Sequence, residues 1–274
     1  MRRGAARSAA VLALGLCLAV SSAACAASFD LMTTDPWLGS IGAFLGGTYL
    51  PVAPITPWQV DGKTEKHRWD GKTPLLALDV AQAKRFRLVG RDGRLLPHVS
   101  VLYDERPQTD GQPDEVFYLD PARLPYVAQK VMTVAASLQP KHYSFFQRRL
   151  AEFESRLNST ILSGRQQLSG RRFWELGGCL SVFWQALGCQ VEKSGAEAKA
   201  EVQHWLSLPD SLRRKTSPPW KGATLIVDWT VSASLARSLR GAPGVAFIDP
   251  PVGPQPLFAL HDTFLKLGQE RPCP

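Results

Sequence analysis

Apolar and polar positions along the first 90 residues alternate between short apolar runs and amphipathic segments. The short runs end at glycine or proline and predict strands over Phe29–Thr33, Tyr49–Ile55 and Phe86–Val89. Helices are expected between them, over Trp37–Leu45 and Pro74–Lys84. Because strands that alternate with helices are typical of parallel βαβ units, this half is predicted to form one α/β lobe.

The central part predicts two helices. Asp120-Pro121 offers an N-cap followed by a proline at the first helical position. Apolar residues then recur at helical spacing at Leu124, Val127, Val131, Ala135 and Leu138. A second helix is expected from Pro140 to about Leu168, with an apolar stripe of Phe146, Leu150, Phe153, Leu157 and Ile161. At 1.5 Å per residue it would be about 43 Å long, enough to link two lobes.

The last third repeats the alternation of strands and helices. The expected strands are Phe173–Leu176, Thr224–Asp228 and Val245–Ile248, and the expected helices are Gly177–Gly188, Val231–Leu239 and Leu257–Leu267. The pattern predicts an α/β fold in which two βα lobes are joined by a long spine helix. The boundaries are an N-terminal lobe over residues 27–139, a linking helix over 140–169 and a C-terminal lobe over 170–274.

The first residues are predicted to be a secretory signal peptide over residues 1–26. Three arginines precede the apolar run Ala9–Val20, and Ala24-Cys25-Ala26 offers a cleavage pattern. We therefore expect a periplasmic or other extracytoplasmic location. Lipid anchoring at Cys25 is the alternative, which Ser22 disfavours because a bulky aliphatic residue is usual there. Cleavage would lower the net charge from +8 to about +5.

Composition narrows the class of function. The basic residues that remain after cleavage are scattered rather than clustered, so no nucleic-acid partner is expected. The chain contains no GxSxG, HExxH, P-loop or GxGxxG motif, and we predict that it is not an enzyme. The mature chain keeps Cys179, Cys189 and Cys273, of which one pair could form a disulfide after export. The pairing stays open.

Four segments resemble the substrate-binding proteins of bacterial zinc and manganese ABC transporters (solute-binding protein family 9). His67-Arg-Trp-Asp-Gly-Lys-Thr-Pro74 is similar to H-x-Y-E-P-x-P of that family, and Glu115–Pro121 to P-H-x-W-L-D-P. The segment from Gly177 to Gly188 stands in the place of H-x-A-F-x-Y-x-x-x-x-Y-G, and Phe247–Pro250 in that of a strand end with a carboxylate ligand. The resemblance implies the metal-type periplasmic binding protein fold.

The resemblance also implies a set of metal ligands. His67 matches the first family histidine and Asp249 the acidic ligand. The other two ligand positions fall on Val116 and Gly177, where Glu115 and Glu175 are the nearest substitutes. One imidazole with two or three carboxylates favours manganese or iron over tight zinc binding. The hypothesis requires His67 and Asp249 to converge across a crevice between the lobes.

Three functions stay open. In the first, a monomeric carrier delivers a divalent Mn, Zn or Fe ion to an ABC permease in the inner membrane. In the second, the metal site has decayed and the cleft binds another small ligand, with the backbone N–H groups at Gly177-Gly178 receiving an anion. In the third, the fold serves as a protein-interaction module.

Overall fold

The computed structural model describes residues 29–58, 67–105, 114–213, 215–251, 255–270 and 272–273. The predicted signal peptide over residues 1–26, and with it Cys25, lies outside the described residues. No helix in the described ranges combines the length and the apolar character that crossing a membrane requires.

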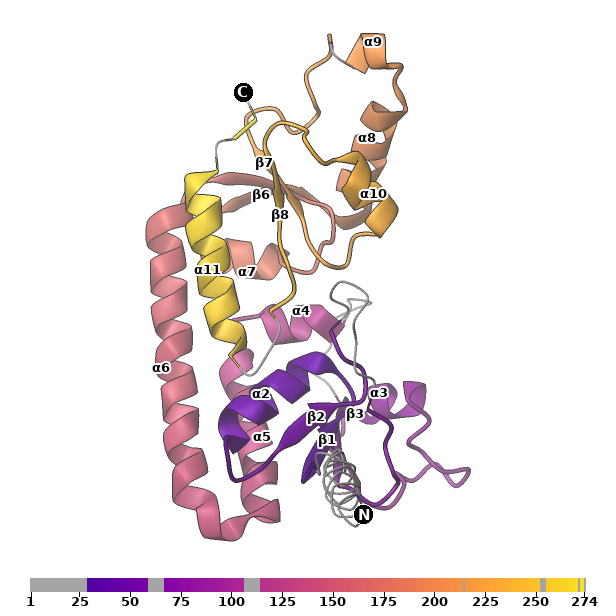
Figure 1. Ribbon diagram of the computed structural model, residues 1–274, viewed down its shortest axis with the longest axis vertical. Coiled ribbons are helices and arrows are strands. Elements are labelled where there is room, and N and C mark those ends of the chain that lie inside the picture. Colours follow the sequence, from indigo (N-terminus) through magenta and orange to yellow (C-terminus); the bar gives the residue numbers. More distant parts are fainter. Residues whose placement is uncertain are drawn as a thin grey trace, which may run out of the picture.

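The N-terminal lobe is built on a four-stranded parallel sheet (Figure 1). Its strands are β1 (Leu31–Thr33), β2 (Val52–Pro54), β3 (Leu75–Asp79) and β4 (Val99–Tyr103), in the order β2-β1-β3-β4. Its helices are α2 (Pro36–Gly46), α3 (Val80–Arg85), α4 (Asp114–Leu119) and α5 (Leu124–Leu138). Helix α2 follows the carboxyl end of β1, and α3 follows the carboxyl end of β3.

The C-terminal lobe repeats this topology. Its parallel strands are β5 (Arg172–Glu175), β6 (Gln190–Ser194), β7 (Thr224–Val227) and β8 (Val245–Phe247), in the order β6-β5-β7-β8. Its helices are α7 (Ser181–Ala186), α8 (Gly195–Ser207), α9 (Asp210–Arg213), α10 (Ala233–Ser238) and α11 (Pro256–Gln269). In each sheet the chain therefore reverses its direction of winding between the first and third strands of the lobe.

A long helix links the lobes. A short 3₁₀ turn at Pro140–His142 leads into α6 (Tyr143–Leu168), whose 26 residues span about 39 Å. In Figure 1, α6 runs along one side of the molecule past both lobes, and α11 packs beside it. The two βα lobes and the spine helix confirm the predicted fold class.

The lobes share one hydrophobic core. A single cluster of buried side chains extends from Leu31 and Phe44 in the first lobe, through Phe153 of α6, to Trp184 and Phe264 in the second. The opposite faces of the two sheets carry smaller clusters of their own. The main core is therefore continuous across the linking region, and both lobes contribute buried side chains to it.

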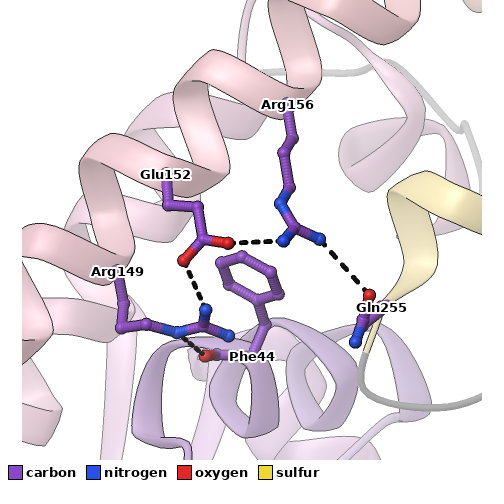
Figure 2. Close-up of polar contacts among 5 residues, drawn as sticks. All are labelled: Phe44, Arg149, Glu152, Arg156 and Gln255. Carbon is purple, nitrogen blue, oxygen red and sulfur yellow. Dashed lines mark hydrogen bonds and ion pairs between the residues drawn. The ribbon is translucent and has the colours of Figure 1, made fainter.

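A polar network fixes α6 against both lobes (Figure 2). Arg149 donates from Nε to the carbonyl oxygen of Phe44 at 2.9 Å, and both Arg149 and Arg156 pair with Glu152. Arg156 also donates to Gln255 Oε1 at 3.3 Å, just before α11 begins. The guanidinium of Arg149 lies 3.9 Å from the centroid of the Phe44 ring. The network thus connects α2, α6 and the entry to α11.

Several expected elements differ from the observed ones. Pro74–Lys84 is not one helix: Leu75–Asp79 forms β3 and only Val80–Arg85 is helical. A strand buried on both faces reads as a continuous apolar run, which hides its period of two. The expected strand Phe86–Val89 is reduced to an isolated bridge between Val89 and Leu95, and the helix after Gly177 begins only at Ser181.

The cysteines also differ from one expectation. Cys179, Cys189 and Cys273 are all buried, and no disulfide joins any two of these three residues. Cys189 instead donates from its thiol to the Leu168 carbonyl oxygen at 3.3 Å.

Candidate functional site

The polar residues of interest lie where the strands of the two sheets end. In an open parallel sheet, the crevice outside the carboxyl ends at the point of reversed winding is the usual ligand site. In the C-terminal lobe this point lies between β5 and β7, where Glu175 ends β5 and Asp228 follows β7. In the N-terminal lobe it lies between β1 and β3, and Asp35 follows β1.

Glu175, Cys179 and Asp228 form a compact cluster. One potential ligand atom from each residue lies within 4.8 Å of the others, and all three side chains are buried. Among the described residues this is the one group of three or more His, Cys, Asp or Glu side chains that could hold a metal ion. The turn between β5 and α7 returns Cys179 to the two strand ends.

Hydrogen bonds fix both carboxylates of the cluster. Glu175 accepts from the backbone N–H of Leu180 and from the hydroxyl of Ser181, each at 2.5 Å. Asp228 Oδ1 accepts from the backbone N–H and the hydroxyl of Thr230, at 2.8 and 2.5 Å. The other oxygen, Asp228 Oδ2, is buried without a hydrogen-bond partner in the described part of the chain.

Gly177 makes room for the Asp228 carboxylate. A Cβ atom added at position 177 would lie 1.8 Å from Asp228 Oδ2, a distance that no packing adjustment of a few tenths of an ångström can relieve. The carboxylate of Asp228 therefore fills the space in which a side chain at this position would begin. The resemblance to family 9 places a ligand at Gly177, so Asp228 supplies an oxygen where that ligand would start.

The electrostatics of the cluster favour a bound proton or cation. Burial raises the pKa of Glu175 to about 7; its hydrogen bonds from Ser181 and Leu180 oppose this increase, whereas the nearby Asp228 adds to it. Burial also raises the pKa of Asp228, against the effect of its hydrogen bonds from Thr230. Ionising both of two neighbouring buried carboxyl groups costs free energy, because each charge loses its hydration and the two charges repel each other. A cation bound between them would offset this cost.

The residues expected from the sequence are not gathered in one place. The His67 ring packs edge-on against Phe29, at 4.8 Å between centroids, beside the start of β1 and not its carboxyl end. Asp249 is exposed and lines a cavity of about 500 Å³ together with Asp262 and Lys266 of α11. The cluster of the described residues contains Glu175 but neither His67 nor Asp249. The side chain of Glu115 lies outside the described residues.

The helix start after Gly177-Gly178 holds an internal carboxylate. The first N–H groups there were expected to receive an external anion, but the backbone N–H of Leu180 donates to Glu175. The helix itself, α7, has only six residues. The anion site expected at Gly177-Gly178 is therefore already occupied by the side chain of Glu175.

A cavity of about 400 Å³ lies between the lobes at the facing strand ends. The N-terminal lobe contributes Trp37, Trp58 and Tyr118 to its walls, and the C-terminal lobe contributes Trp229 and Thr230. Because Thr230 also donates to Asp228, a single side chain connects the cavity wall with the carboxylate cluster. The cluster thus adjoins the cleft in which a two-lobed protein would bind its ligand.

Sequence reasoning missed Cys179, Asp228 and the aromatic walls of the cleft. A usable signal existed: an acidic residue follows or ends an apolar strand at Asp35, Asp79, Glu175, Asp228 and Asp249. Parallel strands bring such residues to the same edge of a sheet, so the pattern alone would have marked Asp228 as a candidate at that edge, although not as the neighbour of Glu175.

The two lobes and the long helix that links them have the fold of known metal-binding proteins. Among solved structures, ZnuA matches with a TM-score of 0.62 and 12% identity over 89% of this chain and 99% of that chain. The laminin-binding protein Lmb of Streptococcus agalactiae, described as bifunctional with adhesin and metal transporting activity, matches with a TM-score of 0.61 and 13% identity over 89% and 99%.

A third similar structure is a manganese-bound mutant of a periplasmic metal-binding protein from Candidatus Liberibacter asiaticus, with a TM-score of 0.56 and 13% identity over 87% of this chain and 97% of that chain. No family model and no curated protein matches the sequence. At these identities the likeness shows that the chain has the fold of the metal-type substrate-binding proteins.

Proposed function

We propose that this protein is the exported substrate-binding component of an ABC transporter for a divalent transition-metal ion. Glu175, Cys179 and Asp228 would hold the ion beside the cleft. The observation that carries the proposal is the buried cluster itself, in which three ligand atoms lie within 4.8 Å of one another. The unpartnered Asp228 Oδ2 supports it, because a buried carboxylate oxygen is costly without a proton or a cation.

The ligand set favours zinc. One thiolate and two carboxylates match the soft and borderline ligands that Zn²⁺ takes in tetrahedral sites, with a fourth position left open. Manganese prefers oxygen-rich shells of higher coordination number, which three side chains do not supply. The replacement of His67 and Asp249 by Cys179 and Asp228 in the proposed site therefore moves the expected cargo from manganese or iron toward zinc. An open position suits a cargo that must be released.

We propose that the protein is a monomer and that it delivers the ion by docking on a permease in the inner membrane. The fold supports it, as does the metal transporting activity in the description of Lmb. A binding role, and not catalysis, follows from the same proposal, because the cluster requires only that the ion be held and released.

Metal titration of chelator-treated protein tests the proposal. Isothermal titration with zinc, manganese and iron(II) should give the highest affinity for zinc at one site. Cys179→Ala and Asp228→Asn should each weaken zinc binding more than about tenfold, the equivalent of 1.4 kcal/mol.

Two variants serve as matched controls. Cys189→Ala removes another buried cysteine, and Asp249→Asn removes a carboxylate that follows the neighbouring strand β8. Both should leave the zinc affinity unchanged. Wild-type affinity in Cys179→Ala and Asp228→Asn, or loss of binding in Asp249→Asn, would contradict the proposed site.

A further inference from the structure

One edge of the C-terminal sheet ends at strand β8. This strand is last in the order β6-β5-β7-β8, so among the described residues a strand pairs with it on one side only. The backbone N–H of Ile248 donates to the Val227 carbonyl oxygen of β7 at 2.9 Å. Because alternate residues of a strand direct their N–H and C=O groups to opposite edges, Val245 and Phe247 direct theirs away from β7. These groups form the kind of edge on which another strand can pair.

A cavity of about 500 Å³ runs along this edge. The consecutive residues Val245–Pro250 line one side of it, and α11 lines the other. Since successive side chains of a strand point to opposite faces, a cavity lined by every residue in turn lies along the edge of the sheet and not over one face. Phe247, in this edge, is 44% exposed. An exposed strand edge of this kind is where extended peptides bind as an added strand.

The groove is acidic although the chain as a whole is basic. Asp249, Asp262 and Glu270 line it together with one lysine, Lys266, whereas the net charge of the chain is +8. Within the described ranges, no lysine or arginine forms an ion pair with any of these three carboxylates. The nearest such contact is from Asp262 to Nδ1 of His261, at 3.8 Å. The groove therefore presents negative charge that no lysine or arginine of the described chain neutralises by direct pairing.

The charges of the groove determine which strand can pair there. A second copy of this chain that paired edge to edge through β8 would bring the same carboxylates together, and like charges across an interface disfavour association. A segment with lysine or arginine side chains has the complementary charge. The same acidic residues thus disfavour self-association and favour a basic partner.

We propose that the groove between β8 and α11 binds an extended, lysine- or arginine-rich segment of a partner protein as a fifth strand of the C-terminal sheet. The backbone of the segment pairs with the outward N–H and C=O groups of Val245 and Phe247. Its basic side chains lie beside Asp262 and Glu270. The pairing ends at Pro250, which has no N–H to donate.

A short synthetic peptide tests this proposal. The probe is the acetylated and amidated peptide KVKVKV, titrated by calorimetry into the chain without residues 1–26. We expect saturable binding with a Kd below about 1 mM. The peptide EVEVEV has the opposite charge, and KVKVKV with N-methylated central amides lacks the backbone donors, so each should bind at least tenfold more weakly. No binding of KVKVKV, or equal binding of either control peptide, would overturn the proposal.

Two substitutions of Phe247 test the backbone pairing. Phe247→Ala and Phe247→Pro both remove the ring, but only the proline removes the outward N–H, and proline is tolerated on an edge strand where the N–H faces solvent. Phe247→Pro should therefore bind KVKVKV at least fivefold more weakly than Phe247→Ala. Equal affinities would contradict strand addition at β8. Sedimentation should show a monomer; a dimer that Phe247→Pro dissociates would assign the edge to a second copy instead.

Charge variants test the acidic wall on α11 without changing β8. The double variant Asp262→Asn and Glu270→Gln should bind KVKVKV at least fivefold more weakly at low ionic strength, and its affinity should depend less on salt than that of the wild type. Asp30→Asn is the matched control, because Asp30 is also exposed but lies before β1 of the other lobe. An equal loss in Asp30→Asn would show that only the overall charge matters and would overturn the proposed location.

This inference and the metal proposal fail separately. Neither Asp262 nor Glu270 belongs to the cluster of Glu175, Cys179 and Asp228, so the double variant should keep the zinc affinity of the wild type. The peptide is titrated without metal and zinc without peptide. Retained peptide binding in Asp228→Asn would show that the groove acts independently of the metal site, whereas its loss there would contradict the location along β8.

Discussion

At the scale of single residues, Gly177 and Asp228 have to be considered together. Position 177 is where the resemblance to family 9 requires a ligand, and glycine there first suggests that the site has been lost. The structure gives a different reason for the glycine: the Asp228 carboxylate occupies the place of its side chain, and the would-be Cβ lies 1.8 Å from Oδ2. The Asp228 carboxylate can therefore occupy its place in the cluster only because position 177 has no side chain.

Gly177→Ala should therefore displace the Asp228 carboxylate. We expect a loss of stability of about 1–3 kcal/mol from overpacking, together with weaker zinc binding. Urea unfolding of the metal-free protein and zinc titration measure the two effects. In an Asp228→Ala background the same substitution should cost much less, because the clashing oxygens are gone. Additive effects of the two substitutions would show that Gly177 and Asp228 are not coupled.

The sequence identified Glu175 as a candidate but not its partners. Glu175 was found because the family resemblance points to its segment, whereas Asp228 lies two strands later along the chain and Cys179 was considered only for a disulfide. Their convergence depends on the order β6-β5-β7-β8, which places β7 beside β5. Strand order is set by packing of the whole lobe and leaves no local pattern.

At the scale of elements, amphipathic helices were predicted best. The stripe beginning at Leu124 became α5, and the stripe of Phe146, Phe153 and Leu157 became the buried face of α6. Short strands buried on both faces were harder, since Leu75–Asp79 has no alternation to distinguish it from a helix. The strand β6 and the helix α8 were not predicted at all, and β6 is largely polar and lies at the sheet edge.

The contacts of α6 predict unequal effects for two neighbouring arginines. Arg149→Ala removes the hydrogen bond to the Phe44 carbonyl, the contact with its ring and one pair to Glu152. We expect the free energy of unfolding to fall by about 1–3 kcal/mol, measured with urea. The control Arg148→Ala removes an exposed side chain that contacts only the Phe145 ring among the interactions of the described residues, and should cost at most about 0.5 kcal/mol. Equal losses would contradict the role assigned to this network.

At the scale of the whole molecule, the arrangement of the two sheets explains where a ligand can bind. Both sheets have the same strand order, and residues at the carboxyl ends of both line a single cleft. The continuous core along α6 and α11 connects the lobes on one side. Closure around a ligand is therefore expected to be small, because a large rotation would break this shared core.

The buried carboxyl pair predicts how the stability of the metal-free protein depends on pH. The folded-state pKa of Glu175, about 7, exceeds the ordinary value of 4.5, so the folded protein keeps a proton that the unfolded chain loses. Its contribution is fully present below about pH 4.5 and is lost as the pH rises to about 7, which amounts to about 3 kcal/mol at 1.36 kcal/mol per pKa unit. The raised pKa of Asp228 acts in the same direction.

Comparison with Glu175→Gln isolates this contribution, because the amide has the same shape and does not ionise. The difference in unfolding free energy between wild type and Glu175→Gln, measured with urea from pH 4.5 to 7.5, should change in favour of the variant as the pH rises. Saturating zinc should reverse the trend in the wild type, since the ion stabilises the ionised carboxylates and is displaced by protons at low pH. Parallel pH profiles of wild type and variant in the metal-free state would contradict a Glu175 carboxyl group that keeps its proton near neutral pH.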